Sequence, residues 1–306
     1  MAGEGRARLL AKRIMTKRRS VDGIYYQVYK KVVSNEARLP SLPDVALKVR
    51  SAMSNENAGM KEMARIIQTD PPLAAQIIRT ANSPLYRSGM PFSNVLEAIK
   101  RMGTQATRNV VYSHSLRSLF RFRQKVLRDI SSEIWHDSVQ TAAIASVLAS
   151  HSRHVSPDKA LLAGLIQDIG ALPLLAELSD NHPNVVKNSD EVRRVVSSFK
   201  VEVGYHLVKA WGFDDEFLEV MKSREDWMRD VNSKLDLSDV LLLSRWHAAV
   251  GTPSLRNMPR VVDMPAYQKF PANKLSPEQS LDVLETAQEQ MDEISNMLGK
   301  PTMPVK

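Results

Sequence analysis

The residues best suited to chemistry are Gln167 and Asp168, which lie inside the apolar stretch ALLAGLIQDIGALPLLAEL (160–178). Leucines recur at helical spacing on both sides of Asp168, and the other rows of this stretch are also apolar. We therefore expect one buried helix that carries both polar side chains into a core. A buried carboxylate without a partner is destabilising by several kcal/mol. Asp168 must be protonated, hydrogen-bonded, paired with a cation or bound to a metal ion.

The histidines do not form a metal site by their spacing. His151 and His154 are three residues apart, but no third ligand is close in sequence, so a polar helix end is favoured. His206 shares a helical face with apolar residues and is typical of a core histidine. His247 follows Ser244 by three residues on one face, and we expect it to lie nearest to Asp168.

Composition excludes several classes of site. The 306 residues contain no Cys, which excludes disulfides, thiolate nucleophiles and Cys-zinc sites. Only 12 residues are Gly, which leaves little material for phosphate-binding loops, and no G-x-S-x-G elbow occurs. The apolar runs are too short for a transmembrane segment, and no apolar stretch follows the basic start of the chain. We therefore expect a cytoplasmic protein.

Positive charge is concentrated at the start of the sequence. Residues 1–20 contain one acid, Glu4, and seven basic residues: Arg6, Arg8, Lys12, Arg13, Lys17, Arg18 and Arg19. This leader could bind nucleic acid or an anionic membrane surface, or it could be a solvated arm that docks weakly. The arm is favoured because the apolar stripe of the leader is thin and has no aromatic anchor.

Nearly every patterned segment has helical spacing, which predicts an all-α protein. Asp44 and Asp70 are expected N-caps, and the helix that starts at Pro71 is expected to stop at Asn82 in a left-handed conformation. Four prolines between residues 252 and 271 predict an extended connection. After it, Ser276-Pro277-Glu278-Gln279 predicts the start of an acidic amphipathic helix that reaches Met297.

Five segments together resemble one known family. They are QTDPPLAAQIIRTANSPLY (68–86), AIKRMG (98–103), IWHDS (134–138), ALLAGLIQDIG (160–170) and VEVGYHLVKAWGF (201–213), and in this order they resemble the HDOD domain of bacterial signalling proteins. The resemblance covers residues 39–251. It implies two packed helical lobes, 39–122 and 123–251, between a basic helical leader (1–38) and the Pro-marked connection with its C-terminal helix (252–306).

The HDOD family is related to HD-domain metal phosphohydrolases, so the resemblance also implies a set of positions that correspond to a metal site. In this chain Gln167 stands in place of a metal-binding His, and Asp168 is retained. The other corresponding positions hold Asp137, Arg224, Glu225, Ser244 and Lys200, and His247 lies three residues after Ser244. An amide is a poor substitute for imidazole on a transition metal, and an arginine repels a cation.

Three interpretations of Asp168 follow. The favoured one is a buried network in which Asp168 pairs with Arg224, Arg245 or His247. The others are a retained small-molecule pocket and a divergent phosphohydrolase that uses Asp137, Asp168 and Glu225. We expect a non-catalytic signalling module without metal or cofactor, which binds a protein partner or a small ligand. A further alternative for the function, separate from these interpretations of Asp168, is binding of nucleic acid or a membrane surface through the leader.

Overall fold

The computed structural model describes residues 28–32, 34, 40–53, 59–83, 86, 91–152, 154–270, 285 and 288. The charged leader (1–20) lies outside the described residues, as does the predicted C-terminal helix apart from residues 285 and 288. The described part contains no strand, which confirms the all-α fold. Its elements are α3 (Asp44–Met53), α4 (Gly59–Gln68), α5 (Pro71–Ala81), α6 (Val95–Met102), α7 (Thr104–Leu116), η1 (Arg117–Phe120), α8 (Lys125–Ser150), α9 (Pro157–Ile166), α10 (Ala171–Asn181), α11 (Pro183–Val186), α12 (Ser189–Ala210), α13 (Asp215–Ser223), α14 (Leu237–Ala248), η2 (Pro253–Asn257), η3 (Val261–Asp263) and α15 (Pro265–Gln268).

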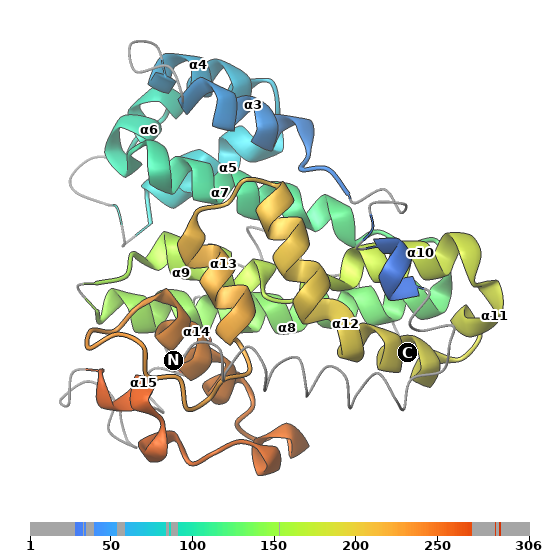
Figure 1. Ribbon diagram of the computed structural model, residues 1–306. Helices are drawn as coiled ribbons and strands as arrows, with labels where there is room; N and C mark the ends of the chain where they lie inside the picture. Colours follow the sequence, from blue (N-terminus) through green and yellow to red (C-terminus); the bar gives the residue numbers. More distant parts are fainter. Residues whose placement is uncertain are drawn as a thin grey trace.

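The helices are arranged around α8 and α9. Figure 1 shows α3 to α6 gathered at one end, with α7 between them and the α8–α9 pair. The helices α10, α11 and α12 extend to the opposite side, and α14 packs against α8 and α9. Segments far apart in the sequence therefore meet at the centre of the molecule.

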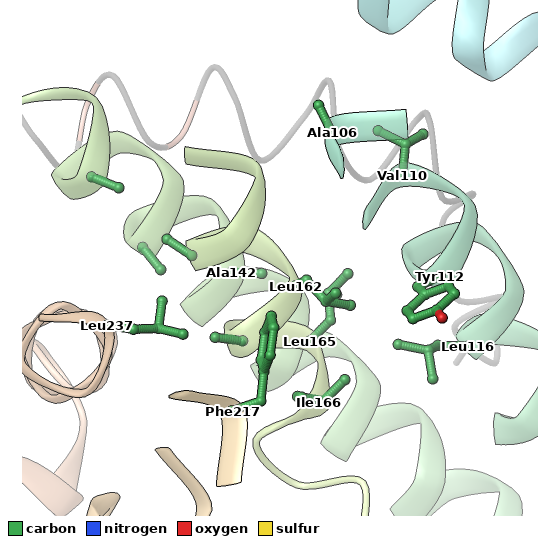
Figure 2. Close-up of a cluster of buried hydrophobic side chains, with 14 of the residues drawn as sticks. Ala106, Val110, Tyr112, Leu116, Ala142, Leu162, Leu165, Ile166, Phe217 and Leu237 are labelled. Carbon is green, nitrogen blue, oxygen red and sulfur yellow. The ribbon is translucent and has the colours of Figure 1, made fainter. Parts of the chain in front are cut away.

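A continuous apolar core joins the two predicted lobes. In Figure 2, Val110 and Leu116 of α7 lie near Leu162 and Leu165 of α9, and Phe217 of α13 approaches the same cluster. All five side chains are buried. The division at residue 122 stays a prediction, because this core extends across it.

The start of α5 follows its local sequence signal. The Asp70 side chain accepts a hydrogen bond from the Leu73 amide at 3.1 Å, as an N-cap does. The predicted left-handed stop at Asn82 is wrong, because its φ is −92°. Its side chain instead bonds the Phe92 amide at 2.8 Å and the Phe92 carbonyl at 2.9 Å, which joins the end of α5 to the segment before α6.

The apolar stretch around Asp168 is two helices rather than the single helix that its periodicity predicts. The helix α9 ends at Ile166, residues 167–170 form a turn, and α10 begins at Ala171. Gln167 and Gly170 keep right-handed helical angles, so apolar spacing continues across the turn and hides it. The turn packs on α12: a Cβ at Gly170 would lie 2.0 Å from the Lys200 carbonyl oxygen and 2.3 Å from the Gly204 nitrogen.

This same stretch, Pro157–Asn181, is long and apolar enough by composition to cross a bilayer, with a mean hydropathy of 1.6 over 18 residues. However, 89% of that window is buried inside the protein. Core helices commonly have this composition, so the observation is weak support for a membrane span.

The Pro-marked segment is folded rather than extended, which corrects the prediction. Pro253 and Pro265 lie in the first turns of η2 and α15, where a missing amide proton does not break a helix bond. The segment packs on α14 through buried Met264 and Phe270. Lys269 adds ion pairs of 3.4 Å to Asp239 and 3.2 Å to Asp230.

Residues 28–32, which fall within the predicted leader, are helical and docked. Val28, Tyr29 and Val32 are buried in a second apolar cluster with residues of α10 and α12. The Tyr29 ring stacks on Phe199 of α12 with their centroids 4.8 Å apart. This short segment therefore contributes to the core.

Candidate functional site

Five elements bring charged residues together around Asp168. Asp168 lies in the turn between α9 and α10, Lys200 near the middle of α12, and Arg224 directly after α13. Arg245 projects from α14, and Asp137 lies on α8. The family-related positions 137, 168 and 224, spread over nearly ninety residues of sequence, thus approach one another in the fold.

Asp168 is buried and holds two cations. Its Oδ1 atom lies 2.7 Å from Nη1 of Arg224 and 2.6 Å from Nζ of Lys200. Asp168 is 7% exposed and Arg224 1% exposed. Arg224 is one of the three partners that the sequence suggests. Lys200 is a partner that sequence reasoning missed, although the family resemblance includes its position.

Arg224 also links three segments of backbone. Its Nη1 donates to the carbonyl of Gln167 in the α9–α10 turn. Its own carbonyl accepts a hydrogen bond from Nη1 of Arg245. The Arg245 guanidinium lies 5.4 Å from the centre of the Trp227 ring, at a cation–π distance. The network therefore holds the turn, the end of α13 and α14 in one arrangement.

The ion pairs determine the protonation of the site. Burial raises the pKa of Asp168, but the charges of Arg224 and Lys200 outweigh burial and hold this pKa well below its usual range. Burial lowers the pKa of Lys200, and Asp168 partly opposes that effect. Burial and the charge of Arg224 lower the pKa of Arg245 to about 9. At neutral pH, Asp168 is therefore an anion between cations.

The other family-related side chains do not bond Asp168. Ser244 donates to the Val240 carbonyl at 2.7 Å, and His247 Nδ1 bonds the Leu243 carbonyl at 2.7 Å, both within α14. The buried Nε2 of His247 has no hydrogen-bond partner among the described residues. Glu225 is exposed. Asp137 is exposed on α8, but neighbouring protein atoms desolvate its carboxylate and raise its pKa, and the charge of Asp168 adds to the rise.

The donors do not fit the divalent metal that the HD relationship implies. Asp168 directs Oδ1 at two cations, and Gln167 offers only an amide oxygen. Glu225 is exposed, and the cations Lys200 and Arg224, rather than Asp137 or Glu225, contact the Asp168 carboxylate. Within the described part of the chain, no three His, Asp or Glu side chains are grouped to hold a metal.

The depressed pKa of Asp168 predicts acid sensitivity. Below about pH 4 the unfolded chain binds a proton that folded Asp168 does not, so the free energy of unfolding should fall by up to about 1.4 kcal/mol per pH unit. The contribution is fully present above the unfolded pKa. Urea unfolding at several pH values below 5 should show a steeper decline in the wild type than in Asp168→Asn. Parallel declines would contradict the assignment.

The chain is similar to one protein family and to several solved structures. The HDOD domain family matches residues 39–227. The fold is similar to a solved protein from Shewanella amazonensis provisionally named a metal-dependent phosphohydrolase, with TM-score 0.74, 25% identity and coverage of 88% of this chain and 98% of that one. An HDOD domain protein of unknown function from Geobacter sulfurreducens gives TM-score 0.59 and 18% identity over 90% of this chain and 98% of that one.

This chain covers a smaller share of two further relatives. A provisionally named signal transduction protein from Marinobacter aquaeolei has TM-score 0.60 and 20% identity over 89% of this chain and 61% of that one. An uncharacterized protein of Treponema pallidum is 23% identical over 137 residues, which are 43% of this chain and 25% of that protein. The chain thus matches about a quarter of this curated relative. Since the family match at residues 39–227 spans more than half of the sequence, the chain belongs to the HDOD domain family.

Proposed function

We propose that this chain is a non-catalytic signalling module that acts by binding a protein partner. One observation carries the proposal: Asp168, at the position of a metal-binding aspartate, is paired with Arg224 and Lys200. The two cations occupy the electrostatic role that a metal ion would have in an HD phosphohydrolase. The site then stabilises the contact between helices instead of activating water.

Coulomb's law explains why these cations oppose metal binding. Two unit charges 4 Å apart repel by about 4 kcal/mol at an effective dielectric constant of about 20, and a divalent ion doubles that repulsion. Arg224 is buried and cannot swing into solvent without breaking its bond to Gln167. A metal ion would therefore have to displace a side chain that the core holds in place.

The name of one related protein supports a signalling role. The relative from Marinobacter aquaeolei is provisionally named a signal transduction protein, and it shares this fold. We extend that role to this chain as part of the proposal. A signalling module needs a partner, and this chain would receive or pass on its signal by association.

A divergent metal-dependent phosphohydrolase is the second candidate function. It is favoured by the 25% identical relative from Shewanella amazonensis, whose provisional name is that activity. It would use Asp137, Asp168 and Glu225. The exposure of Glu225 and the cations on Asp168 weigh against this assembly.

Turnover and metal content separate the two candidates. The full-length protein, incubated with Mg²⁺, Mn²⁺, Fe²⁺ or Zn²⁺, should not hydrolyse p-nitrophenyl phosphate or bis-p-nitrophenyl phosphate above the rate of Asp168→Asn. Elemental analysis should find less than one metal ion per chain. The control Asp180→Asn removes an exposed carboxylate elsewhere. Metal-dependent hydrolysis that persists in Asp180→Asn and disappears in Asp168→Asn would overturn the proposal.

A further inference from the structure

The helical segment 28–32 docks on α10 and α12 with one side only. Figure 1 shows it in blue beside α10. Val28, Tyr29 and Val32 are buried, whereas Lys30 is exposed. Buried positions i, i+1 and i+4 are the pattern of an amphipathic helix lying on an apolar surface.

Three residues of α10 and α12 receive the aromatic and polar groups of this segment. The Tyr29 ring stacks on Phe199 with an angle of 21° between the ring planes. The Tyr29 hydroxyl donates a hydrogen bond to Glu202. Nζ of Lys31 lies 3.3 Å from Oε1 of Glu177. We call Glu177, Phe199 and Glu202 the docking face.

The fit of the segment at Glu177 is incomplete. Glu177 is buried, and its Oε2 accepts a hydrogen bond from Asn181 at 2.9 Å. Its Oε1 lies 3.6 Å from Nε2 of His182, and neither of these buried atoms has a hydrogen-bond partner among the described residues. Lys31 gives Oε1 an ion pair from a side chain that is 44% exposed. Because a buried acceptor without a hydrogen bond is costly, Glu177 favours a ligand with a better-placed donor.

The segment is suited to exchange with another helix. Its buried side chains belong to the second apolar cluster, not to the continuous core around α8 and α9. Burial of these few side chains favours docking, but the entropy lost in ordering the backbone opposes it. Parts of a fold with few buried contacts open at the lowest free energy. Helix α10 packs directly on α12, so the docking face keeps its position when the segment leaves.

The chemistry of the docking face selects a protein ligand. Two carboxylates accompany one aromatic ring, so the phosphates of nucleic acid or of anionic lipids would be repelled. Buried aromatic and arginine side chains are the usual anchors of protein interfaces. Arginine also suits a carboxylate better than lysine does, because its planar guanidinium donates two parallel hydrogen bonds. The face therefore favours a helix that carries an aromatic residue and an arginine.

We propose that the docking face binds an amphipathic helix of a partner protein, which displaces residues 28–32. The partner helix places an aromatic ring on Phe199 and, two positions later, an arginine on Glu177. Recognition of an amphipathic helix by an apolar surface is a common mode of protein association. This inference rests on the proposed function, since it names the kind of partner. Its test involves neither metal nor turnover, so either can fail alone.

Fluorescence anisotropy with the full-length protein tests the proposal. The probe is a fluorescein-labelled peptide with the sequence of residues 24–38, which stands in for the partner helix. The open variant Val28→Ser, Tyr29→Ser, Val32→Ser weakens docking of the protein's own segment and leaves the docking face unchanged. We expect saturable binding of the peptide to the open variant. The wild type should bind at least about tenfold more weakly, because its own segment competes for the face.

Changes within the peptide make the result specific without altering the protein. Lys31→Glu should weaken binding at least about tenfold, because it brings a second carboxylate to Glu177. The matched change Lys30→Glu alters the same charge at the neighbouring exposed position and should bind nearly as tightly as the unchanged peptide. Lys31→Arg should bind more tightly, because arginine supplies the hydrogen bond that Oε1 lacks.

Several results would overturn the proposal. They are no binding to the open variant, equal binding by the Lys30→Glu and Lys31→Glu peptides, and no gain from Lys31→Arg. Circular dichroism checks that the open variant is as helical as the wild type, and Tyr29→Ser alone takes its place if the triple change lowers helicity. Light scattering should find a monomeric wild type. A dimer that dissociates in the open variant would replace the partner protein with a second copy of this chain.

Discussion

Replacing Arg224 with methionine is expected to lower the free energy of unfolding by about 3–5 kcal/mol, the usual effect of removing one partner of a buried ion pair. Arg224 is 1% exposed and bonds both Asp168 and the Gln167 carbonyl. Without it, Asp168 keeps only Lys200, and the Gln167 carbonyl loses its guanidinium donor. Urea unfolding followed by circular dichroism measures the change. Asp168→Asn should be destabilising for the same reason.

A double variant separates the ion pair from the loss of packing. Asp168→Leu combined with Arg224→Met removes both charges, so its destabilisation should be smaller than the sum of the two single changes. Lys200, whose side chain is 23% exposed, can then turn toward solvent. Strict additivity of the single changes would mean that the pair is not coupled and would remove the basis for the role assigned to Arg224.

The second large effect is expected at the close contact between the α9–α10 turn and α12. In Gly170→Ala the new Cβ would lie 2.0 Å from the Lys200 carbonyl oxygen and 2.3 Å from the Gly204 nitrogen, both backbone atoms. Helix α12 would have to move away and carry Lys200 from Asp168. We expect a loss of at least about 3 kcal/mol, since overpacking in a core commonly costs 1–3 kcal/mol when side chains can adjust. Thermal unfolding measures it.

Gly204→Ala is the matched control on the opposite side of this contact. Its Cβ would lie 3.4 Å from the Gly170 nitrogen and 3.4 Å from Sδ of Met221, which is close to ordinary contact. The change should therefore lower stability by less than about 1 kcal/mol. If Gly170→Ala and Gly204→Ala unfold at the same temperature, the close approach does not constrain α12.

Local signals in the sequence predicted the helical fold because each depends on neighbouring residues. Asp70 caps α5 with its own side chain, and apolar spacing marks α8 and α12 without knowledge of their partners. The turn at residues 167–170 escaped prediction because its residues keep helical angles. The folded Pro-marked segment escaped it because contacts with α14, over ten residues away, hold it in place.

The candidate site was predictable in part. The sequence suggested Arg224, Arg245 or His247 as the partner of Asp168, and Arg224 is the one of these three that contacts it. Lys200 was not predicted as a partner, because its approach depends on how α12 crosses the turn at Gly170. Ser244 and His247 bond carbonyls one turn back in α14 instead of reaching Asp168, a local alternative that side chains in helices often take.

The helix α12 makes contacts with two separate parts of the fold. This helix contains 22 residues and therefore spans about 33 Å. Near its middle, the Lys200–Asp168 ion pair and the close contact with Gly170 hold the helix against the α9–α10 turn. Just past its carboxyl end, the Trp211 ring donates to the Pro40 carbonyl at 2.8 Å, next to α3. Because α12 contacts both the α9–α10 turn and the segment before α3, it connects the site around Asp168 directly to the part of the fold that contains α3.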